Sequence, residues 1–254
     1  MDAALIGCRF KQRRHSESSE ESSQKMSNGY YQLETGRVSA VENDCDFPPL
    51  KNALTEPNGL LAIGGDLTVT RLLEAYKQGI FPWFNEDEPV MWWSPNPRLV
   101  LFPDELKISA SLKKTLKKSP FEVRFNTAFR DVITACSNTT RPNQAGTWIT
   151  PDIINAYCEL HTLKYAISSE CWLDGKLVGG CYGVLIGSMF YGESMFHTQT
   201  DASKIAFVHL VENLKKHGVG MIDCQMKTPL LASFGGREIA RDEFIQTLNK
   251  LIEF

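Results

Sequence analysis

The sequence contains no run of about 18 or more apolar residues, so no segment is long enough to span a bilayer as a helix. Its seven cysteines are odd in number and include no Cys-x-x-Cys pair, so neither a disulfide framework nor a zinc site is indicated. The net charge is only −3, which argues against a protein that coats nucleic acid through positive charge alone. These absences favour a soluble protein, expected in the cytoplasm, whose 254 residues can bury one sizeable core or two smaller ones.

The composition changes along the chain and predicts three parts. Residues 1–45 hold a short apolar stretch, a basic patch and then an acidic Ser/Glu run, which is the wrong order for a secretory signal. We interpret them as a poorly ordered extension without catalytic residues. Residues 46–105 are rich in Pro, Gly and Trp and are expected to form a small α+β lobe, whose clearest element is a helix with Thr68 or Thr70 as its cap. Residues 106–254 are expected to form the main domain.

The main domain is expected to be mixed α/β. Two segments of strand-like pattern, 168–173 and 176–186, flank Asp174-Gly175, a dipeptide typical of a type I′ hairpin turn. Asn126 is a candidate cap for a helix that precedes this hairpin. A long helix follows the hairpins, with apolar residues at i, i+3, i+4 and i+7, and ends at Gly218.

Residues 108–118 predict a helix that has both an apolar and a cationic stripe. Its apolar residues recur every four positions, and two pairs of lysines are spaced i, i+4. These lysines are Lys113, Lys117, Lys114 and Lys118. Like charges at this spacing repel each other mildly, which favours an anionic partner such as phosphate. A solvated surface helix without a partner is the alternative.

Charged and amide side chains interrupt two apolar segments near the C-terminal end. Glu193 lies in Gly192–Phe196, and Asp223 and Gln225 lie in a strand-like segment from Gly220 to Gln225. An unpaired buried charge is costly, so these side chains are expected to have partners or a function. Asp223 and Gln225 are two residues apart on a strand, so both are expected to point into one cleft. A pair that makes only structural hydrogen bonds is the alternative.

Several short sequence motifs follow one another along most of the chain: EPNGLLAIGGDL, GIFPWF, WWSPNPR, GTWIT, GESMF, ASK and IDCQ. Together, from about Phe47 to about Glu243, they resemble the leucyl/phenylalanyl-tRNA–protein transferases. That family moves an amino acid from a tRNA to the N-terminus of a protein. The resemblance implies an α/β (α+β) fold in which a small N-terminal lobe precedes an acetyltransferase-like (GNAT-like) catalytic domain.

The resemblance also implies the substrates. The donors would be aminoacyl-tRNAs that carry Leu or Phe and, less well, Met. The acceptors would be proteins with N-terminal Lys or Arg, which the added residue marks for N-degron degradation. Because the ester on the tRNA is already activated, no cofactor, ATP or metal is expected, and no membrane partner.

Positions that match the family supply the candidate site residues. Trp83, Trp148, Cys181, Phe190 and Met195 are expected to line a hydrophobic cavity for the donor side chain, which offers no polar handle. For any one of these residues ordinary core packing is the alternative. By the same resemblance, Glu193 would contact the cationic acceptor, and Tyr76 would contact the 3′ adenosine of the tRNA. The four lysines would bind tRNA, and Asp223 and Gln225 would be the catalytic residues.

Four positions depart from the family pattern, among them Ala110 in the lysine helix, where the family commonly has Arg. Cys181 stands where the family often has Met, and Ile167 and Leu230 stand where it often has His. A mechanism that needs imidazole at those two places therefore fails in this chain.

Two other functions are considered. An acyl-CoA-dependent N-acyltransferase would bind pyrophosphate where a strand runs into a helix N-terminus, but the nearest glycine loop, residues 215–220, runs from a helix into a strand. A non-catalytic tRNA- or peptide-binding module could lose Asp223 and Gln225, and both are present.

Overall fold

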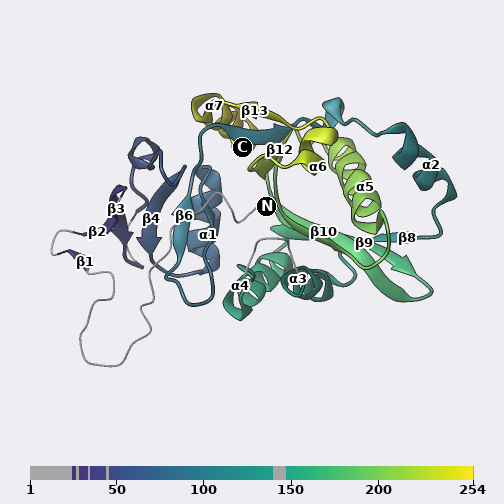
Figure 1. Cartoon of the computed structure of the whole chain (residues 1–254), viewed down its shortest axis with the longest axis horizontal. Coiled ribbons are helices and arrows are strands. Elements are labelled where there is room, and N and C mark those ends of the chain that lie inside the picture. The colour runs from purple at the N-terminus through teal and green to yellow at the C-terminus, as the bar shows by residue number, and fades with distance from the viewer. Residues whose placement is uncertain (1–24, 27–28, 34, 44–45, 140–146, 254) are drawn as a thin grey trace.

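The structure is a computed structural model, and it describes residues 25–253 except 27–28, 34, 44–45 and 140–146. Two sheets with flanking helices form it (Figure 1), which confirms the mixed α/β class. In the described residues, no helix combines the length and apolarity needed to cross a membrane.

The first sheet belongs to the N-terminal lobe and has the strand order β1-β2-β3-β4-β6-β5. Its strands are β1 (Lys25–Met26), β2 (Tyr30–Leu33), β3 (Gly36–Val41), β4 (Leu60–Gly64), β5 (Phe81–Pro82) and β6 (Met91–Trp93). A short 3₁₀ helix, η2 (Leu50–Asn52), lies between β3 and β4. Helix α1 (Val69–Lys77) follows β4, and the hydroxyl of its N-cap Thr68 accepts a hydrogen bond from the Arg71 N–H, so the predicted cap is confirmed.

Strands β2 and β3 lie within the segment expected to be a poorly ordered extension, and there the expectation is wrong. They pair antiparallel, and β3 pairs in parallel with β4, so that Ser39 lies opposite Ala62. Strand β3 buries only Val38 and Val41, a pattern too short to stand out from a polar sequence. Residues 1–24 lie outside the described residues, so the prediction for them stays a prediction.

The second sheet has the order β13-β7-β12-β11-β10-β9-β8. Its strands are β7 (Arg98–Leu101), β8 (Glu122–Phe125), β9 (Ala166–Leu173), β10 (Lys176–Ile186), β11 (Met189–His197), β12 (Met221–Gln225) and β13 (Arg237–Ile239). Strands β11 and β12 are parallel, and β7 pairs antiparallel with β12. Because β7 is part of this sheet, the main domain begins before the boundary expected at residue 105.

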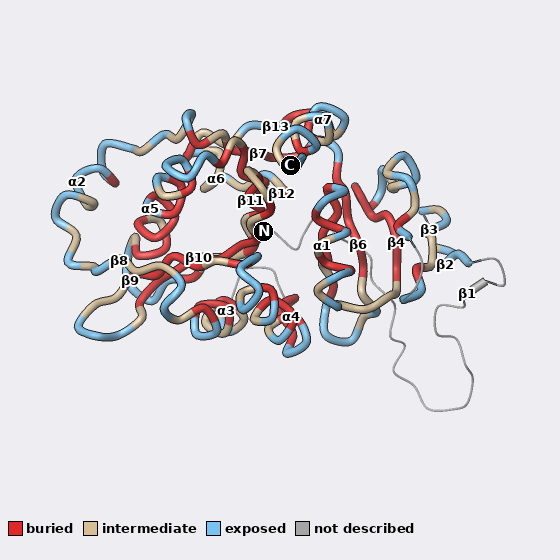
Figure 2. Tube along the Cα trace, turned by 180° about the vertical axis from the view of Figure 1, so that it is seen from behind, coloured by how far each residue is buried: buried red, intermediate tan, exposed pale blue. Residues whose placement is uncertain are grey.

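Two core clusters lie on opposite faces of the second sheet. On one face α3 (Phe129–Ser137) and α4 (Pro151–Thr162) pack together with α1, and on the other face lies α5 (Ala202–Lys216). Figure 2 shows buried residues along β10, β11, β12 and α5 and also along α1, β4 and β6 of the N-terminal lobe. The remaining helices are η3 (Pro103–Glu105), α2 (Ala110–Lys118), α6 (Pro229–Ser233) and α7 (Arg241–Ile252).

The β9–β10 hairpin is confirmed as predicted. Asp174 and Gly175 both have positive φ, 50° and 73°, as a type I′ turn requires. The hairpin sets the register in which Cys181 lies opposite Ser169 on one side and opposite Met195 on the other.

The start of α3 differs from the prediction, because Asn126 does not cap the helix and Glu170 binds the N–H groups of the two residues before it. The Glu170 carboxylate accepts hydrogen bonds from the backbone N–H of Thr127 and of Ala128, both at 2.9 Å, and Asn126 Oδ1 instead accepts from the Ser168 N–H. Burial raises the pKa of Glu170, but these bonds and those from neighbouring side chains outweigh it, and the pKa lies below its usual value. Glu170 is therefore a structural carboxylate.

Candidate active site

A cavity of about 230 Å³ opens between the second sheet and α5. It is lined by Cys181, Tyr182, Phe190, Gly192, Glu193, Ser194, Met195, Phe207, Leu210, Ile222, Cys224, Met226, Thr228, Leu230 and Leu231. Most of these side chains are apolar, and among the described lining residues Glu193 alone carries a carboxyl group. The volume is smaller than the roughly 300–1,000 Å³ of pockets that hold drug-sized ligands, so the cavity suits a single apolar side chain.

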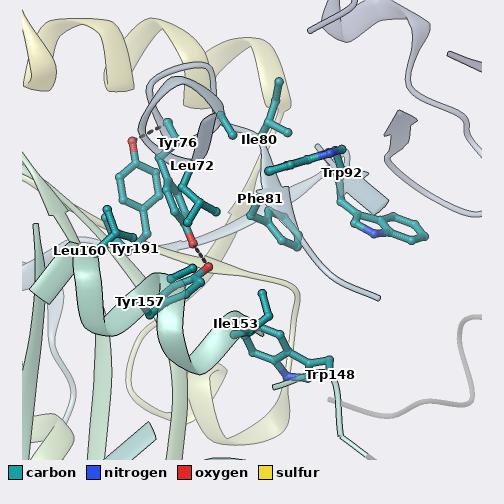
Figure 3. Close-up of a cluster of buried hydrophobic side chains, with 14 of the residues drawn as sticks. Leu72, Tyr76, Ile80, Phe81, Trp92, Trp148, Ile153, Tyr157, Leu160 and Tyr191 are labelled. Atoms are coloured by element: carbon teal, nitrogen blue, oxygen red, sulfur yellow. Dashed lines mark hydrogen bonds between the residues drawn. The ribbon is translucent and has the colours of Figure 1, made fainter. Parts of the chain in front are cut away.

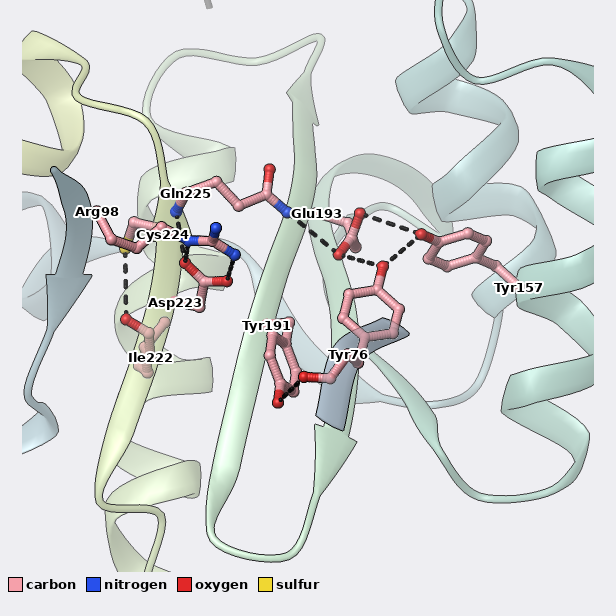
Figure 4. A network of polar contacts seen from close by, with 9 residues as sticks. All are labelled: Tyr76, Arg98, Tyr157, Tyr191, Glu193, Ile222, Asp223, Cys224 and Gln225. Atoms are coloured by element: carbon pink, nitrogen blue, oxygen red, sulfur yellow. Dashed lines mark hydrogen bonds and ion pairs between the residues drawn. The ribbon is translucent and has the colours of Figure 1, made fainter. Parts of the chain in front are cut away.

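Glu193 connects the cavity to a buried polar network drawn in Figure 4. The Tyr76 hydroxyl donates to Glu193 Oε1 at 2.7 Å, and the Tyr157 hydroxyl donates to Oε2 at 3.4 Å. The two tyrosine hydroxyls also hydrogen-bond each other. On the other side, Gln225 Nε2 donates to Glu193 Oε1 at 3.4 Å. Three elements distant in sequence, α1, α4 and β12, thus converge on one carboxyl group.

The surroundings of Glu193 favour its protonated form. Burial is the largest effect and raises its pKa to about 8. The hydrogen bond from Tyr76 lowers the pKa, the charge of Asp223 raises it, and the bond from Tyr157 and the charge of Arg98 lower it. At neutral pH Glu193 is therefore mostly a neutral acid, unlike an ordinary glutamate.

Asp223 is held in a bidentate ion pair with Arg98 of β7. Arg98 Nε donates to Oδ1 at 2.8 Å and Nη2 donates to Oδ2 at 2.7 Å, and both side chains are fully buried. The guanidinium also lies between the rings of Phe81 and Phe244, 4.7 Å from each centroid. The negative charge of Asp223 is thus compensated inside the protein.

Gln225 owes its position to Asp223. Its backbone N–H donates to Asp223 Oδ1 at 2.8 Å, and its φ of 61° lies in the left-handed region, where the pairing of β12 with β7 shifts register. Such a conformation persists only where the surrounding structure over-determines it. It directs the amide group toward Glu193, with Oε1 pointing away from that carboxyl group in Figure 4.

The structure separates the predicted substrate-binding residues into two groups. Cys181, Phe190, Glu193 and Met195 line it, and Tyr76 lies behind Glu193. Trp83 and Trp148 instead pack in the core that joins the N-terminal lobe to α4. Figure 3 shows Trp148 beside Ile153 in this core. The rings of Trp83 and Trp93 meet edge to face. The Trp93 Nε1–H donates a hydrogen bond to the Trp83 backbone carbonyl oxygen at 2.7 Å.

Sequence reasoning missed Arg98 and Tyr157. Arg98 follows Ser-Pro-Asn-Pro and begins a short apolar strand, so it does not interrupt an apolar segment as Glu193 and Asp223 do. Tyr157 lies on the buried face of α4, where nothing in the sequence distinguishes it from a core residue. Of the two positions that replace family histidines, Leu230 lines the cavity and makes it more apolar, whereas Ile167 packs against the core beneath α5.

The predicted lysine helix is confirmed as α2, which starts at a cap formed by Ser109. All four lysines are exposed, and α2 lies at the edge of the main domain in Figure 1, apart from the cavity. The buried stripe of the helix consists of Leu112 with the partly buried Leu116.

Glu193→Gln should remove a large pH dependence of stability. The pKa of Glu193 is about 8 in the folded state and about 4.3 in an unfolded chain, so the native state binds the extra proton between these values and its stability falls as pH rises through this window. The loss amounts to on the order of 4 kcal/mol by pH 8.5. Urea unfolding of both proteins at pH 5, 7 and 8.5 measures it, and parallel stability curves would contradict the assignment.

Comparison with known proteins was made for the sequence and for the fold. The family model described as leucyl/phenylalanyl-tRNA protein transferase matches residues 100–249, and the model of that family's N-terminal domain matches residues 65–96. A relative from Chromobacterium violaceum is 58% identical over 204 residues, covering 80% of this chain and 87% of its own length. One from Nitrosospira multiformis is 56% identical over 214 residues, covering 84% and 92%. Both are named leucyl/phenylalanyl-tRNA–protein transferase.

Solved structures are more distant. A GCN5-related N-acetyltransferase from Kribbella flavida aligns with a TM-score of 0.34 and 9% identity, over 66% of this chain and 60% of its own. A similarity at this level supports no inference about ligand or reaction.

Proposed function

The chain belongs to the leucyl/phenylalanyl-tRNA–protein transferase family and is an aminoacyltransferase, and from this premise we propose its substrates. The donors are aminoacyl-tRNAs carrying Leu or Phe and, less well, Met. The acceptors are proteins that begin with Lys or Arg, and the added residue marks them for N-degron degradation in the cytoplasm.

The apolar cavity beside Glu193 is the observation that carries this proposal. Leu and Phe offer no polar group for recognition, so a protein can select them only by the shape and depth of an apolar cavity. The cavity of about 230 Å³ fits such a side chain, and Glu193 is the carboxyl group among its described lining residues that we assign to the acceptor.

The proposed roles follow from the network. Gln225 orients the incoming amine through its amide oxygen, and Asp223 acts indirectly by fixing the backbone of Gln225. Because the ester on the tRNA is already activated, catalysis consists of positioning and proton transfer. Tyr76 holds Glu193 and is too deeply buried to stack on the tRNA without movement, since its side chain is 0% exposed.

The acyl-CoA alternative is disfavoured by the geometry near Gly218. Helix α5 ends at Lys216 and β12 begins at Met221, so the intervening loop faces the carbonyl end of a helix. That end carries partial negative charge and does not attract pyrophosphate.

A transfer assay tests the proposed function. The protein is incubated with Leu-, Phe-, Met-, Val- or Ile-tRNA and with peptides that differ only in their N-terminal residue, without ATP, CoA or added metal. We expect Leu transfer to be fastest, Phe and Met to be slower, and only Lys- and Arg-peptides to gain the mass of one residue. Acetyl transfer from acetyl-CoA with none from Leu-tRNA would overturn the proposal.

The lysines of α2 should contribute to tRNA affinity. Replacing Lys113, Lys114, Lys117 and Lys118 with Ala should weaken tRNA binding and flatten the dependence of log K on log salt, because each lost phosphate contact removes a released counterion. The fold should survive, since all four side chains are exposed. Binding is measured between 50 and 200 mM salt. An unchanged slope would place the tRNA elsewhere.

A further inference from the structure

The reaction requires a proton acceptor, and the described network contains few candidates. An acceptor protein presents its α-amino group mainly as an ammonium ion, which cannot attack an ester until it has lost a proton. The Gln225 amide is a very weak base. Both carboxylate oxygens of Asp223 already accept hydrogen bonds, one from Arg98 Nη2 and the other from Arg98 Nε and the Gln225 N–H, so a proton would break the ion pair.

Glu193 differs from both in being accessible from the cavity. It lines the cavity, and Gln225, which would orient the amine, contacts the same carboxyl group. An amine placed to attack an ester whose side chain fills the cavity would therefore lie next to Glu193.

We propose that the Glu193 carboxylate is the group that takes the proton from the α-ammonium of the acceptor. This inference rests on the proposed function and assigns a step within it. Once the proton has moved to Glu193, the neutral amine attacks the ester carbonyl carbon and a C–N bond forms. A second proton leaves the nitrogen for the departing ribose oxygen as the C–O bond breaks. The products are the amide and the free tRNA hydroxyl, and Glu193 then releases its proton to water.

The proton affinity of Glu193 suits this step. Its pKa of about 8 matches that of a protein α-amino group, about 7.7–8.0, so the transfer is nearly isoenergetic. Only the ionised form of Glu193, the minority at neutral pH, accepts the proton, so the rate should rise with pH up to about 8.

The groups around Glu193 set this balance from every packed element. Tyr76 of α1 and Tyr157 of α4 donate hydrogen bonds to it. On β12 the charge of Asp223 acts on Glu193, and the Gln225 amide donates to it. Arg98 of β7 lowers the pKa of Glu193 through its charge. Tyr191, which lies on β11 like Glu193, donates its hydroxyl to the Tyr76 carbonyl oxygen.

Single-turnover transfer from Leu-tRNA with two matched acceptors tests the proposal. One is a peptide with N-terminal Arg, and the other is the same peptide with an aminooxy group in place of the α-amine, which is neutral at pH 7 and needs no proton acceptor before attack. At saturating peptide and pH 7, Glu193→Gln should slow the amine acceptor roughly tenfold, because roughly a tenth of an amine with a pKa of about 7.7–8.0 is neutral there without a proton acceptor. It should slow the aminooxy acceptor far less.

Two further variants complete the design. Glu159→Gln makes the same change at an exposed position of α4 and should leave both rates unchanged. Tyr157→Phe removes a hydrogen bond that lowers the pKa of Glu193, so the acidic limb of the pH–rate profile should move to higher pH. Urea unfolding and tRNA binding show that each variant is folded.

The outcomes distinguish a wrong role for Glu193 from wrong proposed substrates. If Glu193→Gln slows both acceptors equally, or raises only KM, Glu193 positions or binds the acceptor and the proposal is wrong. If the wild-type protein transfers to neither acceptor, the proposed substrates are wrong, and the assignment of Glu193 falls with them.

Discussion

Replacing Gln225 with Ala should lower the single-turnover rate of transfer about 10²-fold at saturating substrates, with little change in tRNA affinity. The amide is held beside Glu193, where it can orient the attacking amine, and a misplacement of about 1 Å at a reacting group costs a rate factor of this size. Rapid-quench assays with Leu-tRNA and an Arg-peptide give the rate and KM separately.

Two companion variants isolate the side chain from the backbone. Gln225 has a φ of 61°, which Ala adopts with strain and Gly without it. Gln225→Gly should therefore lose the same activity with less strain at this position. Gln225→Glu would set a second carboxyl group 3.4 Å from Glu193 and should be slow as well. Wild-type rates in both Gln225→Ala and Gln225→Gly would show that the amide is structural.

Asp223→Asn should reduce the free energy of unfolding by about 3–5 kcal/mol, because it leaves the buried Arg98 guanidinium without a counterion. The family resemblance places Asp223 in catalysis, which by itself predicts a loss of rate and not of stability. The ion pair changes that expectation, because any loss of transfer in the single variant includes a structural part. Urea unfolding at pH 7 measures the loss.

The double variant Arg98→Met/Asp223→Asn separates structure from chemistry. It removes both buried charges and keeps an amide oxygen for the Gln225 N–H, so we expect much of the stability to return. If Asp223 acts by holding Gln225, transfer should return with it. Recovered stability with transfer still about 10²-fold low would show instead that the negative charge itself is needed.

Much of the local structure follows from short sequence patterns. Thr68 and the Asp174-Gly175 dipeptide specify a helix start and a hairpin turn through their own backbone and side-chain chemistry, and both occur as expected. The expectation failed at α3, where the N–H groups of the two residues before the helix bond to Glu170, some 40 residues away in the chain. A cap supplied from another strand leaves no local pattern to read.

The sequence by itself determined the family, the mixed α/β class and the identity of most polar residues at the site. Those conclusions depend on motifs and periodicities that span a few neighbouring residues. They also depend on the free-energy cost of burying the polar side chains of Glu193, Asp223 and Gln225 among apolar residues. Only the tertiary structure decided which role each of these residues has. It pairs Asp223 with Arg98, 125 positions apart, and it encloses Glu193 between helices and strands that burial brings together. Burial and neighbouring charges set the pKa of a carboxyl group, and both arise only when distant segments pack.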